Sequence, residues 1–306
     1  MQTRHMTVIQ NLHSKQGPNF FAALELIKPI TWFPPMWAYA CGAISAGVTF
    51  DSKLWLVFLG IFLAGPIVCG MSQAANDWCD RHVDRINEPN RPIPSGRMPG
   101  NWGLKIALGM TVLALGLGWQ LGIWGFISTI IAALAAWAYS IEPIRLKRSG
   151  VWGPGLVGLC YEGIPWFTGA AVMLQAFPDT KIILVAIAYA MGAHGIMTLN
   201  DFKALKGDKA LGINSLPVQL GPERAAKIAC YVMAIPQVVV ITLLFAWGLT
   251  MFSIFVSLLL IGQIIAMRRL LSDPERFAPW YNSTGVLMFV SGMMVCALGL
   301  SQAVAQ

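Results

Sequence analysis

Three aspartates stand close together where a long apolar run of the sequence ends. Asp77, Asp80 and Asp84 are three and four positions apart, a spacing that places their side chains on one narrow stripe of an α-helix. Carboxylates on one stripe repel one another unless cations neutralise them. Oxygen ligands without His or Cys partners suit a hard ion such as Mg²⁺, which usually binds together with substrate phosphates. The spacing predicts a metal-assisted phosphate or diphosphate site, and the alternative is a solvated acidic helix end balanced by neighbouring arginines.

A second polar stretch, residues 200–208, repeats the beginning of the first. Asn76-Asp77 and Asn200-Asp201 each close an apolar run, and Asp208 follows seven positions after Asp201. Two matched acidic stretches favour a diphosphate site with two metal ions over a chance pair of acidic helix ends. We therefore predict that the aspartates of both stretches act as metal ligands and catalytic residues.

The composition indicates a polytopic membrane protein, because 56% of the residues are hydrophobic and only 11% are charged. Apolar runs of about 17 to 25 residues are long enough to cross a bilayer as helices. Such runs predict nine spans, near residues 29–49, 54–76, 102–119, 121–139, 151–173, 182–200, 227–248, 250–267 and 285–303. We expect an all-α fold in which nine transmembrane helices surround a cytoplasm-facing active-site cavity. Residues 1–28 would be a cytoplasmic segment and residues 29–306 a single transmembrane domain.

The distribution of basic residues predicts the orientation. Of the 21 Lys and Arg residues, 19 fall on one side of the predicted spans, and Lys53 and Lys181 fall on the other. The positive-inside rule then places the N-terminus and both acidic stretches in the cytoplasm and the C-terminus on the opposite side. The net charge of +7 gathers on that face, where it attracts anionic lipid and phosphorylated substrates. No basic domain points to nucleic acid, and the scattered cysteines favour neither disulfides nor a zinc site.

Two cytoplasmic loops supply cations. Prolines at 89, 92, 94 and 99 exclude a continuous helix, and Arg91 lies among them. Arginine meets phosphate oxygens with two parallel hydrogen bonds, so we predict a phosphate-binding role for Arg91. The second loop contains Arg145, Lys147 and Arg148, which membrane topology alone would also explain.

Glu162 and His194 are ionisable residues that lie away from the ends of predicted spans. Glu162 precedes Pro165, which should kink its helix, and an acid at membrane depth is either functional or a protonated structural group. His194 stands seven residues before Asp201 and hence on the same helix face. It is a candidate ligand for the metal of a tetrapyrrole, although a single His on an apolar helix is more often only hydrogen-bonded.

The first acidic stretch resembles the signature of the UbiA-type intramembrane prenyltransferases. These have an N-D-x-x-D-x-x-x-D stretch after the second of nine helices, which Asn76, Asp77, Asp80 and Asp84 match, and a second acidic stretch after the sixth. Longer strings are most similar to the bacteriochlorophyll and chlorophyll synthase subfamily. They are ITWFPP at 30–35, MSQAANDWCD at 71–80, EPIRLKRSG at 142–150 and TLNDFK at 198–203. Lys206 departs from the subfamily, in which an acid tends to occupy that position.

The resemblance implies an activity and a set of partners. The expected reaction is Mg²⁺-dependent esterification of a bacteriochlorophyllide propionate with geranylgeranyl or phytyl diphosphate. It implies a multi-pass protein of the bacterial cytoplasmic membrane, with other pigment-biosynthesis or photosynthetic assembly proteins as candidate partners. A quinone precursor or haem is the alternative acceptor, and a transporter with acidic ion sites is the alternative class. The predicted substrate-binding residues are Asn76, Arg91, Arg145, Lys147, Glu162, His194, Asn200, Lys203 and Lys206.

Overall fold

The structure, a computed structural model, describes residues 17–305, apart from the side chains at 206, 211, 304 and 305. Every regular element in this range is a helix. The elements are α2 (Phe20–Leu26), η1 (Pro29–Thr31), α3 (Phe33–Ser45), η2 (Asp51–Lys53), α4 (Leu54–Phe62), η3 (Leu63–Cys69), α5 (Gly70–Asn87), α6 (Trp102–Gln120), α7 (Gly122–Ser140), η4 (Leu146–Arg148), α8 (Trp152–Gly158), η5 (Leu159–Gly163), α9 (Ile164–Leu174), α10 (Thr180–Asn200), η6 (Asp201–Ala204), α11 (Leu205–Leu211), α12 (Leu216–Leu220), α13 (Pro222–Ala246), α14 (Thr250–Ser272) and α15 (Pro274–Ala305). Of the predicted cytoplasmic segment 1–28, residues 1–16 lie outside the described part.

Eight helical segments among the described residues are long and apolar enough to cross a membrane. They correspond to eight of the nine predicted spans, so the all-α membrane class is confirmed. The remaining predicted span, 29–49, contains only the 13-residue α3 as a regular α-helix. Prolines at the first positions of α3 and the left-handed Gly47 (φ 66°) just beyond it bound this helix. The predicted number of nine is therefore not confirmed.

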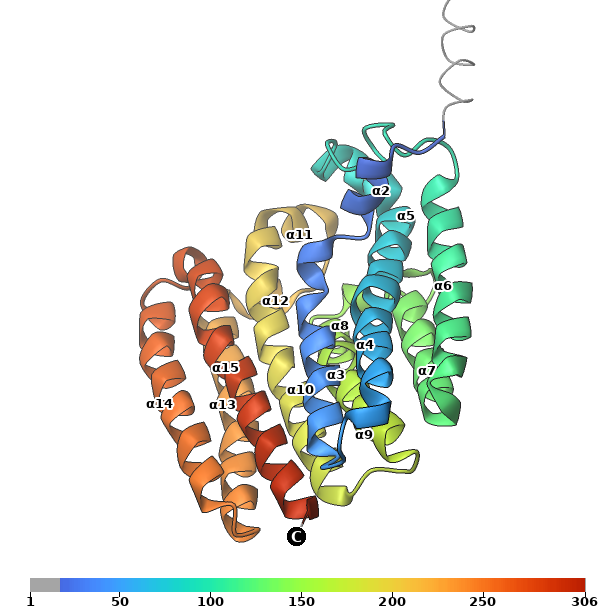
Figure 1. Ribbon diagram of the computed structural model, residues 1–306. Helices are drawn as coiled ribbons and strands as arrows, with labels where there is room; N and C mark the ends of the chain where they lie inside the picture. Colours follow the sequence, from blue (N-terminus) through green and yellow to red (C-terminus); the bar gives the residue numbers. More distant parts are fainter. Residues whose placement is uncertain (1–16, 306) are drawn as a thin grey trace, which may run out of the picture.

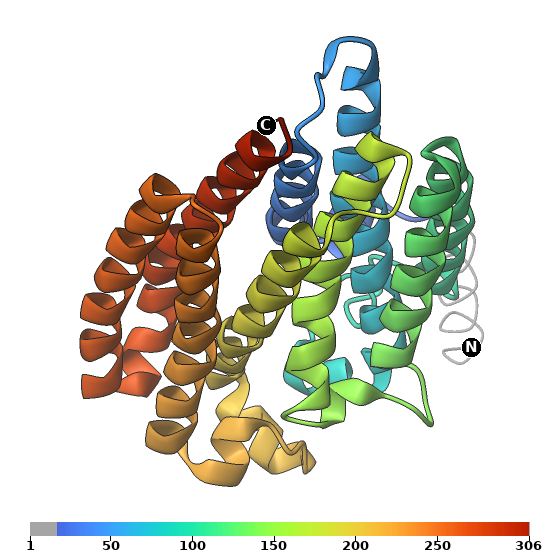
Figure 2. The same cartoon turned by 90° about the horizontal axis from the view of Figure 1, so that it is seen from below.

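The helices form one bundle (Figure 1). Helix α5 packs against α6 and α7, while α10 packs against α8 and α13. Seen from below, α13, α14 and α15 lie on one side of the bundle and α6 and α7 on the other (Figure 2). Helix α3 contacts both α9 and α15, so the beginning of the chain joins the two sides.

Close packing of α3 against α9 depends on glycine. A Cβ atom at Gly42 would lie 2.0 Å from the carbonyl oxygen of Trp166, and one at Gly169 would lie 2.2 Å from that of Tyr39. Small residues let helix backbones approach in a membrane, where apolar burial against lipid provides little drive for association. Larger residues at either position would separate the two helices.

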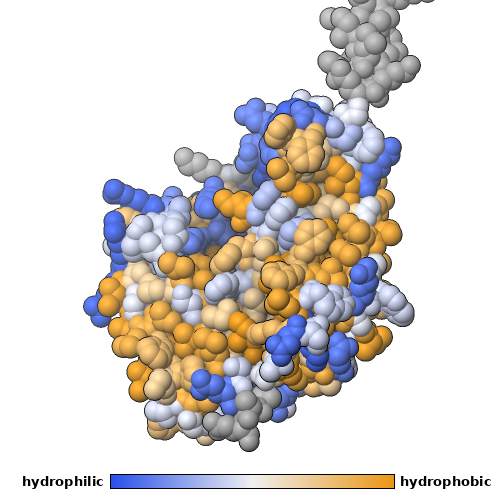
Figure 3. All heavy atoms as spheres, viewed as in Figure 1, coloured by the Kyte–Doolittle hydropathy of each residue, from blue (hydrophilic) through white to orange (hydrophobic). Residues whose placement is uncertain are grey.

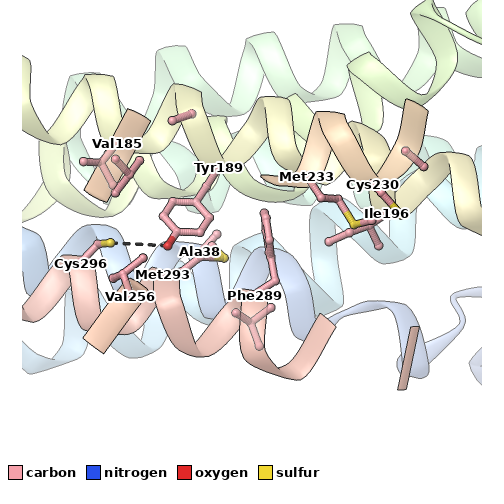
Figure 4. Close-up of a cluster of buried hydrophobic side chains, with 14 of the residues drawn as sticks. Ala38, Val185, Tyr189, Ile196, Cys230, Met233, Val256, Phe289, Met293 and Cys296 are labelled. Atoms are coloured by element: carbon pink, nitrogen blue, oxygen red, sulfur yellow. Dashed lines mark hydrogen bonds between the residues drawn. The ribbon is translucent and has the colours of Figure 1, made fainter. Parts of the chain in front are cut away.

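A cluster of buried hydrophobic side chains joins α10, α13 and α15 (Figure 4). The hydroxyl of Tyr189 lies 3.5 Å from the Sγ atom of Cys296, and its ring packs edge-on against Phe289. These side chains are fully buried. They fix α10, whose last turn leads into the second acidic stretch.

Hydrophilic side chains gather at the end of the bundle that carries α2 and α11, whereas apolar side chains cover much of the bundle body (Figure 3). Both acidic stretches belong to this polar end, since α5 ends there and α11 follows α10 there (Figure 1). An outer surface of this kind fits a lipid environment around the bundle body.

Two π-helical segments interrupt membrane-spanning helices of the bundle. Leu63–Cys69 contains Pro66, and Leu159–Gly163 is followed by Pro165. Proline has no N–H to donate to the preceding turn, so such a segment re-registers the backbone hydrogen bonds and widens the helix. A π-helical segment therefore lies directly before Pro165, where the sequence predicted a kink. Both segments contribute residues to the cavity described below.

Candidate active site

The three aspartates of α5 share one face, as predicted, but their surroundings differ. Asp77 and Asp84 are buried, with relative exposures of 1% and 5%, whereas Asp80 is partly open. Each carboxylate has at least one cationic partner from another segment. Neutralisation by Lys and Arg thus offsets the repulsion among the three acids.

Asp80 receives two cations from the loop that follows α7. Its Oδ1 accepts a hydrogen bond of 2.8 Å from Arg145 Nη2, and its Oδ2 accepts one from Lys147 Nζ. Lys147 also donates to Oδ1 of Asn76 over 2.9 Å. Arg145 adopts a left-handed backbone conformation (φ 34°) and also pairs with Glu142 over 2.7 Å. The side chains at 145 and 147, predicted from the sequence as substrate-binding residues, therefore contact the first acidic stretch directly.

Arg91 joins the other two aspartates. Its Nη1 donates to Oδ2 of Asp84 over 2.9 Å and lies 3.5 Å from Oδ1 of Asp77. The same Asp77 oxygen accepts a hydrogen bond of 2.7 Å from Lys28. The Oδ2 atom of Asp77 is buried and has no hydrogen-bond partner among the described residues.

The second stretch is placed by the end of α10 and by α11. Asn200 is the last residue of α10, and its Oδ1 accepts a hydrogen bond of 2.7 Å from Asn282. Asp201 begins η6, and Asp208 lies in the short helix α11. The side chain of Lys206 lies outside the described residues.

A cavity of about 680 Å³ opens between the two acidic stretches. Its walls include most of the predicted site residues, namely Asn76, Asp80, Asp84, Arg91, Arg145, Lys147, Asn200, Asp201, Lys203 and Asp208. Deeper residues such as Ala64, Val68 and Ala132 give the same cavity an apolar wall. The structure therefore unites a polar, charged end with an apolar interior in one continuous space.

Three predicted residues are not among the described residues that line this cavity. Asp77 lies behind Arg91, closed off by Lys28. Glu162 is buried at 3% exposure in the second π-helical segment, where its Oε2 has no hydrogen-bond partner within residues 17–305. His194 lies with Nε2 at 3.1 Å from the Val151 carbonyl oxygen and Nδ1 at 3.5 Å from the Thr198 hydroxyl. These contacts occupy both ring nitrogens of His194, which favours the structural interpretation of this residue.

Burial shifts the pKa values of two cavity-lining groups that lie outside the spans. Removal from water lowers the pKa of Lys147 from its ordinary value, although the attraction of Asp80 opposes this. Removal from water also raises the pKa of the Asp208 carboxyl group. Both groups face the cavity, where perturbed pKa values are typical of functional sites.

The donor set of the cavity fits a hard cation. Carboxylate and amide oxygens converge from α5, α10 and α11, and the buried Oδ2 of Asp77 has no hydrogen-bond partner in the described part of the chain. Within residues 17–305, no group of three His, Cys, Asp or Glu side chains is already gathered at metal-binding distances. Lys and Arg instead hold the carboxylates of α5, so a metal ion would have to exchange with these cations.

Sequence reasoning missed several residues of the site. Lys28 pairs with Asp77 from 49 positions away, and sequence alone marked it only as a cytoplasmic charge. Tyr139 and Tyr161 line the cavity, and Gln73 Nε2 donates to the Tyr161 hydroxyl over 3.3 Å. A polar residue next to a span end was the available signal for Lys28 and Tyr139, but that signal equally fits an interfacial anchor.

Comparisons with known proteins agree with this geometry. The model of the UbiA prenyltransferase family matches residues 31–299. The chain is 63% identical over 295 residues to the bacteriochlorophyll synthase 33 kDa chain of Cereibacter sphaeroides, covering 96% of this chain and 98% of the relative. It is 34% identical to the chloroplastic chlorophyll synthase of Oryza sativa subsp. japonica, covering 91% and 76%. A solved UbiA homolog from Archaeoglobus fulgidus bound to DMAPP and Mg²⁺ has a TM-score of 0.69 at 20% identity, covering 90% of this chain and 99% of that chain.

Proposed function

The chain belongs to the UbiA prenyltransferase family, and from this premise we propose that it esterifies the propionate of a bacteriochlorophyllide with a C20 prenyl diphosphate. The donor would be geranylgeranyl or phytyl diphosphate. The observation that carries the proposal is the single cavity in which carboxylates, cations and an apolar wall meet at the polar end of a membrane bundle. The strong similarity to bacteriochlorophyll synthase supports the choice of acceptor.

The reaction is an alkyl transfer. An oxygen of the acceptor carboxylate attacks C1 of the allylic diphosphate, the C1–O bond breaks, and its electron pair leaves with pyrophosphate. A propionate is already ionised near neutral pH, so the protein need not supply a strong base. The catalytic demand therefore falls on stabilising the leaving group.

The charged end of the cavity suits this demand. Arg91, Arg145 and Lys147 line it, and guanidinium groups bind phosphate oxygens bidentately. The aspartates at 80, 84, 201 and 208 line the cavity and are the residues that would hold Mg²⁺. Asp77, which Lys28 and Arg91 hold outside the cavity wall, would join them after exchanging these cations for the metal ion. Bound Mg²⁺ would act as a Lewis acid toward the diphosphate oxygens.

The apolar wall has a complementary task. Ala64, Val68 and Ala132 border the inner part of the cavity and also a smaller apolar pocket beyond it. An isoprenoid chain seated there would be removed from water, and water would be kept from the allylic cation. The polar end would then hold only the diphosphate and the reacting carboxylate.

We also propose the orientation that the basic residues favour. The chain would span a bacterial cytoplasmic membrane, either inner or intracytoplasmic, with the N-terminus and the cavity mouth on the cytoplasmic side. The acidic stretches would then face the compartment that contains water-soluble Mg²⁺ and diphosphates.

The experiment that tests the function uses the purified protein with Mg²⁺ and geranylgeranyl diphosphate. Acceptors are supplied one at a time, namely bacteriochlorophyllide, haem and a quinone ring precursor, and the products are separated by chromatography. We expect an esterified pigment from bacteriochlorophyllide. Prenylation of only an acceptor other than bacteriochlorophyllide would refute the proposal.

A further inference from the structure

The segment from Asn19 to Trp32, called here the N-terminal strap, lies across the polar end of α5. Ala22 and Leu26 of α2 are fully buried in a cluster that also contains Ala74 of α5 and Met98 of the proline-rich loop. The strap therefore packs against both the helix that carries the first acidic stretch and the loop that carries Arg91.

A first polar link joins the strap to this loop. Nη2 of Arg97 donates to Oε1 of Glu25 over 2.9 Å, and Nη1 of Arg97 donates to the other oxygen. Both side chains are exposed, at 41% and 47%. A pair in this setting contributes little to the stability of the fold. Its bidentate geometry nevertheless fixes the position of the loop relative to α2.

A second link passes through Asp77. Lys28 donates to Oδ1 of Asp77, which lies 3.5 Å from Nη1 of Arg91. Lys28 has a left-handed backbone conformation (φ 45°), and its carbonyl oxygen accepts a hydrogen bond of 2.8 Å from the Thr31 hydroxyl. The indole of Trp32 fastens the same turn by donating to the Ile27 carbonyl oxygen over 2.8 Å. A strained residue held by its surroundings in this way is typical of functional sites.

We propose that the N-terminal strap is a positioning element for the prenyl diphosphate, with Glu25 and Lys28 as positioning residues that act through Arg91. The two links reach Arg91 by different routes, one through Arg97 of the same loop and the other through Asp77 of α5. Arg91 itself lines the cavity, whereas neither strap residue is among the described residues that do so. This inference rests on the proposed function, because it assigns the anion at Arg91 to the diphosphate of the donor.

A charge swap tests the first link. Glu25→Arg and Arg97→Glu should each raise the KM for prenyl diphosphate about fivefold, which corresponds to a loss of about 1 kcal/mol of binding free energy. The KM for bacteriochlorophyllide and the Tm should not change. The double variant Glu25→Arg/Arg97→Glu restores the pair with its polarity reversed, and its KM should return to within about twofold of the wild-type value. Arg85→Glu changes an exposed residue at the same end by the same charge as Arg97→Glu, and it controls for weaker attraction of the anionic substrate in that variant.

Lys28 provides the second test. Lys28→Met should weaken binding of an unreactive thiolo-diphosphate analogue of the donor about tenfold, while Lys28→Arg should bind it nearly as well as wild type. Lys28→Met also leaves Asp77 with less neutralising charge, so its Tm should fall. Without added Mg²⁺, where loss of a metal ligand does not affect binding, Lys28→Met/Asp77→Asn should recover the Tm but not the affinity, because Arg91 would still lack its support.

Two results would overturn the inference. One is a charge-swapped double variant that remains as impaired as Arg97→Glu alone, since Arg97 would then act on the anion directly. The other is full recovery of affinity in Lys28→Met/Asp77→Asn, since Lys28 would then only neutralise a buried charge. Failure of the proposed function would look different, because wild-type protein would then form no esterified pigment and would not bind the analogue.

Discussion

Asp80→Asn keeps the size of the side chain and removes its charge, which makes it the most informative change in the site. In the structure Asp80 neutralises Arg145 and Lys147, and all three side chains are only 13% to 15% exposed. Removing the charge leaves two partly buried cations without their shared partner. We expect a loss of about 1 to 3 kcal/mol of stability, between the values for exposed and fully buried pairs.

The expected loss of activity is much larger than this loss of stability. If Asp80 helps to hold Mg²⁺ at the diphosphate, its charge is needed where negative charge develops on the leaving group. Loss of one such preorganised group lowers turnover by about 100-fold or more. Initial rates of pigment esterification across a Mg²⁺ titration, with a thermal unfolding curve for each variant, separate the two effects.

Two further variants make the test decisive. Asp80→Asn/Lys147→Met rebalances the charge and should recover the Tm without recovering turnover. Asp273→Asn removes an acid at the same end of the bundle, where Asp273 only caps the start of α15, and should turn over at the wild-type rate. Near-normal rates for Asp80→Asn at limiting Mg²⁺, or restored turnover in the double variant, would show that Asp80 is a structural counter-charge.

The other predictions concern pH, the metal ion and topology. Burial lowers the pKa of Lys147, so Lys147 loses its positive charge as the pH rises through that lowered pKa. The kcat/KM for the prenyl diphosphate should therefore fall at alkaline pH. Lys147→Arg should move this fall to higher pH, because arginine stays protonated. An unchanged alkaline limb in Lys147→Arg would contradict this role. Replacing Mg²⁺ with Ca²⁺ should lower turnover in the same assay, because the larger ion tolerates looser geometry, and equal rates with both ions would count against a metal-positioned leaving group. A cysteine introduced in loop 85–99 should react with an impermeant thiol reagent only from the cytoplasmic side, and one at 178–180 only from the other; the reverse pattern would invert the orientation.

The sequence predicted those parts of the fold that depend on local pattern. Apolar length identified the membrane helices, and the spacing of the first acidic stretch correctly placed its aspartates on one helix face. The weakest prediction was the first span, because the average hydropathy of 29–49 hides the prolines and the glycine that bound α3. The short helices α11 and α12 were also missed, since segments this short have no clear period in the sequence.

The sequence predicted the acidic residues of the candidate site and some of its basic residues. Arg91, Arg145 and Lys147 proved to contact the acidic stretch itself. The contact of Lys28 with Asp77 depends on how the N-terminal strap crosses α5, which no local pattern specifies. The described residues that line the cavity likewise do not include Asp77 and Glu162, which are buried, or His194, whose ring nitrogens contact Val151 and Thr198. Sequence spacing gives the helix face of a residue but not what packs against that face.

The proposed reaction depends on attack by the acceptor carboxylate on C1 of the prenyl diphosphate. The direct measurement uses bacteriochlorophyllide whose propionate carries ¹⁸O in both oxygens, with purified protein, Mg²⁺ and geranylgeranyl diphosphate, followed by mass spectrometry of the ester and the pyrophosphate. Attack by the carboxylate predicts that the ester keeps both labelled oxygens and that the pyrophosphate contains none. Loss of one labelled oxygen from the ester would mean that the carboxyl group was activated instead, and it would contradict the account.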